Sequence, residues 1–201
     1  MIGRRALPLL AAAPALAQAP QQADYRWKVV RNGTEIGTHN VIFGREGDAV
    51  SALSEVLVTP RVLGVVVYRF EHRYTEVTRG GRLVSVRSRL NRSGTIVEVE
   101  ADAVAGGIAL RGPEGALRLP ADAAPLSWWH PERFGGAVPI FGTTTGKLMD
   151  LRWTRIALPT GGTRWQCAGE VDATLDYDAR GRWIAYSVLG DDGSTVSYSA
   201  A

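Results

Sequence analysis

The residues best suited to chemistry lie in one stretch, residues 68–76, with the sequence YRFEHRYTE. Its even-numbered positions are aromatic or carry functional groups, and its odd-numbered positions are mostly charged. Successive side chains in a β-strand point to opposite faces, so His72, Tyr74 and Glu76 are predicted to share one face. A histidine and a carboxylate held on one face could act as a general acid and base.

Arginines on the next predicted strands could add a site for an anion. A two-residue turn at Gly80-Gly81 places Tyr74 opposite Arg87 and His72 opposite Arg89. The following hairpin, closed at residues 91–94, brings Glu98 beside Arg87. Guanidinium groups match the oxygens of carboxylate and phosphate. The candidate site for an anionic headgroup therefore comprises His72, Tyr74, Glu76, Arg87, Arg89 and Glu98.

Two interpretations of these residues depend on the face of the sheet that they occupy. On the interior face they would line a polar pocket, whereas on the exterior face they would form ion pairs worth about 0.2 to 1 kcal/mol each. The aromatic residues of 68–76 favour the interior, but Val84, Val86, Val97 and Val99 favour the opposite face of their own strands. A bulge between the strands, or a curved sheet covered on both faces, would reconcile the two patterns.

A second cluster, SWWHPERFG at residues 127–135, combines two tryptophans with several ionisable side chains. Aromatic residues in a crossing segment usually pack into a core, which predicts that Trp128 and Trp129 plug the interior. The alternative is a lid over a hydrophobic cavity, in which Trp128, Trp129 and His130 bind a ligand and His130 lies at the rim. The pattern places no chemical partner beside His130.

Familiar catalytic and metal-binding patterns are missing or incomplete in the sequence. Residues 142–147 (GTTTGK) have one residue too few between the glycines for a phosphate-binding loop. His39, His72 and His130 lack the close spacing of a zinc site, and no serine or cysteine lies in a nucleophile elbow. The single cysteine, Cys167, is predicted to be buried and inert. We therefore expect no catalytic residue of a standard hydrolase, no metal and no cofactor.

The N-terminus is typical of an export signal. Arg4 and Arg5 precede an apolar run at residues 6–17, and small residues then offer cleavage after residue 17 or 19. The run contains two prolines and is shorter than the roughly 20 apolar residues of a membrane span. We expect residues 1–19 to be a cleaved signal peptide for the twin-arginine or the general route, residues 20–24 to be a linker, and the mature protein to be periplasmic with no transmembrane segment.

The charge balance argues against nucleic acid as a partner. The formal net charge of +3 falls to +1 when the signal peptide with Arg4 and Arg5 is removed. Acidic and basic residues are spread along the mature chain, whereas nucleic-acid-binding domains carry a basic patch or stripe.

The rest of the chain is predicted to be all-β. Short runs of alternating apolar residues are separated by turns such as Asn32-Gly33, a strong hairpin signal. About eleven strands between residues 25 and 199 exceed the usual size of an open sheet, which favours one antiparallel meander curled into a barrel or half-barrel. We expect residues 25–201 to form a single β domain. Residues 120–141 cross or cap it, with a short helical turn or loop near 126–136 as a plug or lid.

Several turn motifs resemble those of an uncharacterised family of exported proteobacterial β-rich proteins, a domain of unknown function. They include NGTEIGTH at residues 32–39, YRFEH at 68–72, TTTGKL at 143–148 and LDYD at 175–178. The resemblance covers nearly the whole mature chain and implies the family's fold, but it carries no catalytic residues. The family is similar in pattern to curved-sheet envelope proteins, among them lipid or lipoprotein carriers, which implies an interior able to hold an apolar chain.

These features favour a periplasmic protein that binds or carries a hydrophobic or amphipathic small molecule in a barrel-like cavity. An enzyme that uses His72 and Glu76 as acid and base, with Arg87 as an anion clamp, is the first alternative, and it requires a shared concave site. A structural subunit of an envelope complex is the second alternative, and it predicts a contiguous exposed apolar patch instead of a cavity.

Overall fold

The computed structural model describes residues 23–190 and 192–201. The expected signal peptide and most of the expected linker lie outside these residues. The described chain consists of β-strands and turns, with one short 3₁₀ helix, η1 (Pro131–Arg133). Among the described residues, no helix is long and apolar enough to cross a membrane.

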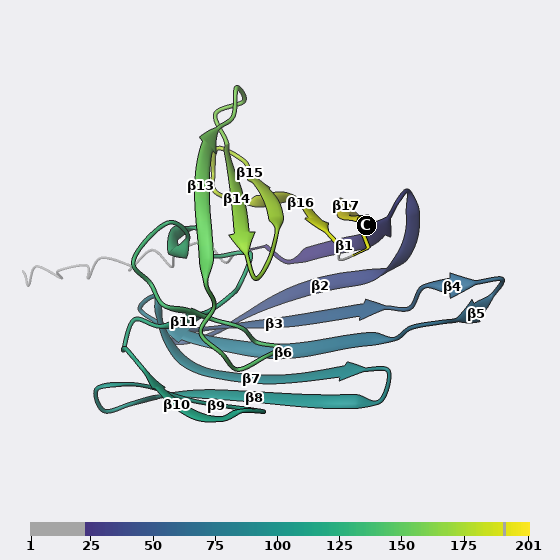
Figure 1. Ribbon diagram of the computed structural model, residues 1–201. Helices are drawn as coiled ribbons and strands as arrows, with labels where there is room; N and C mark the ends of the chain where they lie inside the picture. The colour runs from purple at the N-terminus through teal and green to yellow at the C-terminus, as the bar shows by residue number, and fades with distance from the viewer. Residues whose placement is uncertain (1–22, 191) are drawn as a thin grey trace, which may run out of the picture.

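Thirteen strands of the described chain pair into one antiparallel sheet (Figure 1). On one side of the sheet lie β10 (Gly115–Leu119), β9 (Gly107–Gly112), β8 (Thr95–Val104), β7 (Arg82–Arg92), β6 (Phe70–Arg79), β3 (Ala49–Val58), β2 (Thr34–Glu46) and β1 (Tyr25–Arg31), in this spatial order. The order continues with β17 (Thr195–Ala200), β16 (Trp183–Leu189), β15 (Ala173–Tyr177), β14 (Thr163–Gly169) and β13 (Leu151–Ala157).

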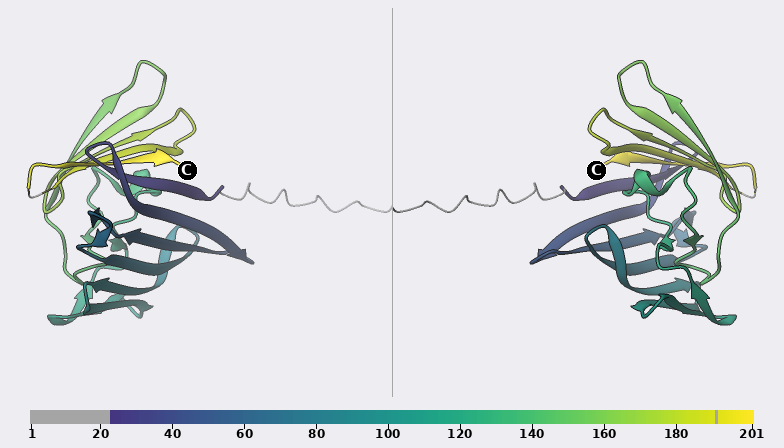
Figure 2. Two further views of the ribbon diagram at one scale, coloured as in Figure 1. Left: turned by 90° about the vertical axis from the view of Figure 1, so that its right-hand side faces the viewer. Right: turned by 90° about the vertical axis from the view of Figure 1, so that its left-hand side faces the viewer.

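The first described strand, β1, pairs inside the sheet with the last strand, β17. The edges of the sheet are therefore β10 and β13, and residues 120–150 run from one edge to the other. Figure 2 shows the sheet curled, with the crossing segment between its two halves. The predicted all-β half-barrel is confirmed, although its strands were undercounted. The sheet is not closed, because its edge strands β10 and β13 do not pair with each other.

The crossing segment contributes little regular structure of its own. Its strands β11 (Ala124–Pro125) and β12 (Ile140–Phe141) form a short parallel pair, and η1 lies between them. Pro131 occupies the first position of η1, where its fixed φ favours helix entry and its missing N–H is harmless. The predicted helical turn within residues 126–136 is therefore present.

A β-bulge sets the register between β6 and β7. Val77 pairs with Ser85, but Thr78 pairs with Leu83, so that Val84 is an extra residue in β7. Because side chains alternate faces along a strand, one extra residue exchanges the inner and outer faces of everything beyond it.

The bulge corrects the pairing predicted from the sequence. Tyr74 lies opposite Ser88, and His72 lies opposite Leu90, so the predicted partners Arg87 and Arg89 are each wrong by one residue. The inner face of β6 now matches the apolar inner face of β7. The bulge thus reconciles the two sequence patterns that placed different faces inside.

The hairpin between β7 and β8 is also tighter than predicted. Its turn consists of Ser93 and Gly94, both with positive φ, instead of a four-residue loop. The strands extend further as a result, and Glu98 lies opposite Arg89 instead of Arg87.

One hairpin projects from the sheet between β3 and β6. It contains the short strands β4 (Arg61–Val62) and β5 (Val65–Val66), which pair with each other around a turn at Leu63 and Gly64. Figure 1 shows these two strands extending beyond the ends of the neighbouring strands of the main sheet.

Candidate functional site

A cavity of about 580 Å³ lies on the concave face of the sheet. Its wall comes from both halves of the sheet and from the crossing segment. The lining is mostly aliphatic and aromatic, with a few polar groups: Val29, Ile36, His39, Ser54, Val56, Val58, Tyr68, Phe70, His72, Tyr74, Arg92, Leu126, Trp128, Gly142, Thr143, Thr144, Met149, Val171, Tyr186, Val188, Gly190, Val196 and Tyr198. A concave apolar site with few polar groups is typical of small-molecule binding.

Two buried histidine–serine pairs supply polar groups to the cavity wall. His39 Nε2 lies 2.9 Å from Ser54 Oγ, and His72 Nε2 lies 2.9 Å from Ser88 Oγ. Burial lowers the pKa of His39 to about 3 and the pKa of His72 to about 4. Both imidazoles are therefore neutral at pH 7, and this part of the wall offers hydrogen bonds without charge.

The hydrogen bonds of the two histidines are satisfied to different degrees. Ser88 Oγ donates its one proton to the carbonyl oxygen of Thr143 at 2.6 Å, so His72 Nε2–H must donate to Ser88. His39 Nδ1, in contrast, has no hydrogen-bond partner among the described residues. Buried polar atoms are nearly always paired, so His39 Nδ1 is an unsatisfied polar atom enclosed within the wall.

Arg92 is the one arginine of the described cavity lining. It is exposed at the end of β7, and its guanidinium lies 5.8 Å from the centre of the Phe70 ring. A guanidinium on an aromatic face keeps its N–H groups available to an anion. The cavity thus combines an apolar, uncharged interior with one exposed cation.

The two adjacent tryptophans of the crossing segment have different surroundings. Trp129 is buried, stacked on Tyr74 with ring centres 5.7 Å apart, and in edge contact with Phe43 at 6.1 Å. Trp128 lines the cavity and contacts Tyr186 with ring centres 5.4 Å apart. Trp129 therefore fills the interior as a plug, and Trp128 forms part of the cavity wall.

The same segment makes a buried ion pair with β6. Arg133 Nη2 donates to Glu76 Oε1 at 2.6 Å, and Ser127 Oγ donates to Glu76 Oε2 at 2.6 Å. His130 Nε2 lies 3.9 Å from Glu76 Oε1, and its Nδ1 lies 2.7 Å from Glu132. His130 thus has carboxylate partners that the sequence pattern could not place. Neither it nor Glu76 belongs to the cavity lining.

Sequence reasoning missed Arg133 and Ser127, although both lie within the SWWHPERFG stretch. An energetic argument could have found them, because a carboxylate on an inner face needs a cation and further hydrogen bonds as partners. Glu76 is such a carboxylate, because it is 1% exposed.

The predicted site of six residues does not form. His72, Tyr74 and Glu76 are buried on the inner face, whereas Arg87, Arg89 and Glu98 lie exposed on the outer face. Arg89 pairs with Glu98 at 3.1 Å, and Arg87 pairs with Asp102 at 2.7 Å. The physical reason is the bulge in β7, which turns the arginines outwards.

The acid–base arrangement required by the enzyme alternative is also missing. His72 is hydrogen-bonded to Ser88, and Glu76 is held by Arg133 and Ser127. Four residues along a strand separate the two by about 13 Å. Arg87, the expected anion clamp, lies on the other side of the sheet.

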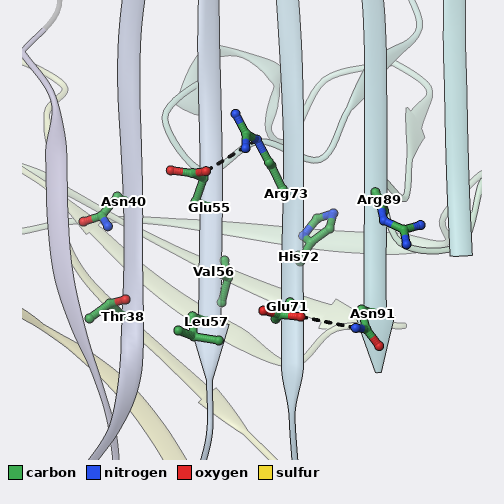
Figure 3. Close-up of a pocket in the computed structure, with 10 residues that line it drawn as sticks. All are labelled: Thr38, Asn40, Glu55, Val56, Leu57, Glu71, His72, Arg73, Arg89 and Asn91. Atoms are coloured by element: carbon green, nitrogen blue, oxygen red, sulfur yellow. Dashed lines mark hydrogen bonds and ion pairs between the residues drawn. The ribbon is translucent and has the colours of Figure 1, made fainter. Parts of the chain in front are cut away.

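Strands β2, β3, β6 and β7 also form an outer depression of about 640 Å³ (Figure 3). Its charged groups are already paired with neighbours: Glu55 with Arg73 at 3.4 Å, and Glu71 with Asn91 at 3.2 Å. Exposed pairs of this kind contribute about 0 to 1 kcal/mol each. We regard this face as a solvated surface and the inner cavity as the candidate site.

The single cysteine lies in surroundings that suppress its reactivity. Cys167 is buried, and burial raises the pKa of its thiol to about 12, so that it stays protonated and a poor nucleophile. Among the described residues, no group of three or more histidine, cysteine or carboxylate side chains is placed to hold a metal ion.

The fold and the cavity define an open β-barrel-like protein whose interior is partly plugged and partly hollow. The chain belongs to the family described as domain of unknown function DUF6134, which matches residues 27–201.

One solved structure is similar in fold, and a second matches more weakly, both at low sequence identity. A β-barrel-like protein of domain of unknown function DUF1849 from Brucella abortus has a TM-score of 0.59 at 8% identity, over 89% of this chain and 94% of that chain. A DUF1089 family protein from Pseudomonas aeruginosa has a TM-score of 0.44 at 14% identity, over 88% and 95%. No curated protein matches the chain. The Brucella protein supports the β-barrel-like fold alone.

Proposed function

We propose that this protein is exported to the periplasm, where it binds or carries a hydrophobic or amphipathic small molecule. The observation that carries the proposal is the cavity of about 580 Å³ on the concave face, with its largely apolar lining. Ligand pockets commonly measure about 300 to 1,000 Å³ and hold a few polar groups that fix orientation.

The distribution of charge suggests how the ligand lies. The imidazoles of the interior are neutral, so an ionised headgroup placed there would lack a counter-ion. Arg92 supplies a cation at the exposed end of β7. The apolar chain of the ligand is therefore inside, and an anionic or polar headgroup lies beside Arg92.

Native mass spectrometry of protein purified from its own host tests whether a ligand is present. Delipidated protein is then titrated with a fluorescent fatty acid, for which we expect saturable binding with one site. If the delipidated, folded protein shows no saturable binding of the fatty acid, the proposal is wrong.

A matched pair of variants on β16 locates the binding site. Val188→Phe fills part of the cavity and is expected to weaken fatty-acid binding about tenfold or more, the equivalent of roughly 1.4 kcal/mol. Ile184→Phe introduces the same side chain at an exposed position of the same strand and should leave binding unchanged. Equal effects of the two substitutions would place the fatty acid elsewhere.

A second matched pair on β7 tests the orientation of the headgroup. Arg92→Gln is expected to weaken binding of a fatty acid about threefold, as for a solvent-exposed ion pair, and to leave binding of the corresponding fatty alcohol unchanged. Arg89→Gln, on the outer face of the same strand, should affect neither. A fatty acid that binds Arg92→Gln as tightly as the wild type argues against Arg92 as the headgroup site.

A further inference from the structure

The projecting hairpin carries a cluster of exposed apolar side chains. Leu63 at its tip is 101% exposed, followed by Val65 at 66% and Val67 at 59%. Val66 and Tyr68 are also exposed. Single exposed apolar residues are ordinary, but a contiguous group on a protruding element marks a contact with a partner or a membrane.

The tip residue is unusual when it is compared with two other turns of this chain. Asn32-Gly33, Leu63-Gly64 and Ser93-Gly94 all have positive φ at both positions. Asparagine is common in this conformation, whereas a bulky apolar residue is a genuine outlier. At the two other turns the first position is polar. The hairpin instead has leucine at this position. The positive φ is unfavourable for a bulky side chain, and exposure of the apolar side chain to water is unfavourable as well.

The apolar residues of this hairpin lie on both of its faces. Val65 and Val66 are the two residues of β5 and both are exposed, and consecutive strand residues point to opposite faces. An element that docks on the surface of a protein buries one face and leaves the other in water. A ribbon that is apolar on both faces is suited instead to immersion in a lipid layer.

The charged residues within the hairpin are of one sign. Between Glu55 and Glu71 the chain contains Arg61 and Arg69 and no acidic residue. Arg61 is exposed and donates through Nη1 to the carbonyl oxygen of Gly64 at 3.0 Å, which holds its cation near the tip. Arg69 pairs with Glu71 at the base. Basic residues next to an apolar insertion favour membranes with anionic headgroups.

We propose that the hairpin formed by residues 59–69 inserts its tip into the interfacial region of a phospholipid membrane that contains anionic lipid. Val58 and Tyr68, at the base of the hairpin, line the inner cavity. Insertion therefore brings that end of the cavity to the membrane surface. Membrane docking does not require the cavity to be occupied, so the two proposals can fail separately.

Vesicle flotation measures the proposed docking directly. The full chain is mixed with vesicles of phosphatidylcholine alone or of phosphatidylcholine with phosphatidylglycerol, and we expect stronger partitioning to the anionic vesicles. The double substitution Leu63→Asn and Val65→Thr should reduce partitioning at least tenfold. Asparagine accepts the positive φ at position 63, so this variant is expected to fold. Leu117→Asn, an exposed apolar residue on β10, is the matched control and should partition like the wild type.

A fluorescent label makes the readout specific to the hairpin tip. Leu63→Cys, in a Cys167→Ala background and labelled with an environment-sensitive dye, should shift to the blue with anionic vesicles, whereas labelled Leu117→Cys should not. Arg61→Gln should weaken partitioning to anionic vesicles about fivefold and leave the weak partitioning to neutral vesicles unchanged.

Three results would overturn the membrane proposal. They are no blue shift at position 63 with anionic vesicles, equal partitioning of the wild type and the double variant, and a dimer of the wild type that the double variant abolishes. The last result would assign the hairpin to a second copy of this chain.

Discussion

Two arginine–glutamate ion pairs lie on opposite faces of the same part of the sheet. They have the same composition but differ in burial and in role. Inside, Arg133 and Glu76 have side chains 8% and 1% exposed, whereas outside, Arg89 and Glu98 are 57% and 67% exposed. The inner pair is separated by 57 positions in sequence and the outer pair by 9. The inner pair fixes the crossing segment against β6, while the outer pair links two strands that the backbone already joins.

Residue type and spacing therefore do not reveal the role of a charged cluster. Both pairs have the composition of an anion site, and the sequence grouped Glu76 with Arg89 and Glu98. Burial separates them, because removing a partner from a buried pair leaves an uncompensated charge, whereas water compensates an exposed one. Measurements of the free energy of unfolding test whether burial separates the two pairs in this way.

The largest effect is expected from Arg133→Met, which leaves Glu76 buried with Ser127 as its remaining strong donor. We expect the free energy of unfolding in urea to fall by about 3 to 5 kcal/mol. Arg89→Met, the matched change on the outer face, should cost less than about 1 kcal/mol. A loss below about 1 kcal/mol for Arg133→Met would show that the inner pair behaves like a surface pair.

A double substitution separates loss of the ion pair from loss of packing. Glu76→Leu combined with Arg133→Met removes both charges and keeps the volume apolar, so it should recover most of the stability lost in Arg133→Met alone. If the double variant is as unstable as the single one, the ion pair itself, and not the unpaired carboxylate, dominates.

Acidification should produce the next largest effect, through the buried histidines of the inner face. The pKa of His72 is lowered from 6.5 to about 4 by burial, so the unfolded chain binds the proton more readily as the pH falls below 6.5. Stability is therefore lost as the pH drops towards 4. For His72 alone, the loss between pH 7 and pH 5 is about 2 kcal/mol.

Urea unfolding at pH 7 and pH 5 measures this dependence, and two variants on β6 assign it. His72→Gln should remove about 2 kcal/mol of the pH dependence, because its amide can donate to Ser88 without titrating. Arg73→Gln, the exposed neighbour on the outer face, should leave the dependence intact. An unchanged pH dependence in His72→Gln would mean that the pKa of His72 is not lowered in the folded state.

The smallest effect belongs to the outer pair itself. A double-mutant cycle with Arg89→Ala and Glu98→Ala should give a coupling energy of about 0.2 to 1 kcal/mol, and added salt should reduce it further. A coupling energy near that of a buried pair would contradict the assignment of this face to solvent.

Much of the fold was accessible from the sequence because turns and alternation are local. Asn32-Gly33 marks a two-residue hairpin, and Pro131 marks the entry of the short helical turn; both are present in the structure. The aromatic residues of β6 favoured the face that is buried in the structure, but the valines of the neighbouring strands favoured the other, so the sequence left the choice of face open. These features depend on neighbouring residues, whose conformational preferences are the same wherever the strand lies.

The candidate site was harder to predict because it depends on register and on long-range contacts. One extra residue, Val84, exchanges the faces of Arg87 and Arg89, and nothing in the pattern of this strand marks its position. The contact between Arg133 and Glu76 joins segments far apart in sequence, so no periodicity relates them.

Turn residues and alternation along the chain are enough to predict an all-β fold with more strands than a flat sheet holds, and therefore a curled sheet that a crossing segment must span. The folded structure was needed to show which charges lie inside, where the sheet stays open, and that Trp129 fills the interior while Trp128 lines a cavity. The physical reason is that alternation fixes which side chains share a face, whereas burial depends on the bulge, the curl and the packing that bring distant segments together.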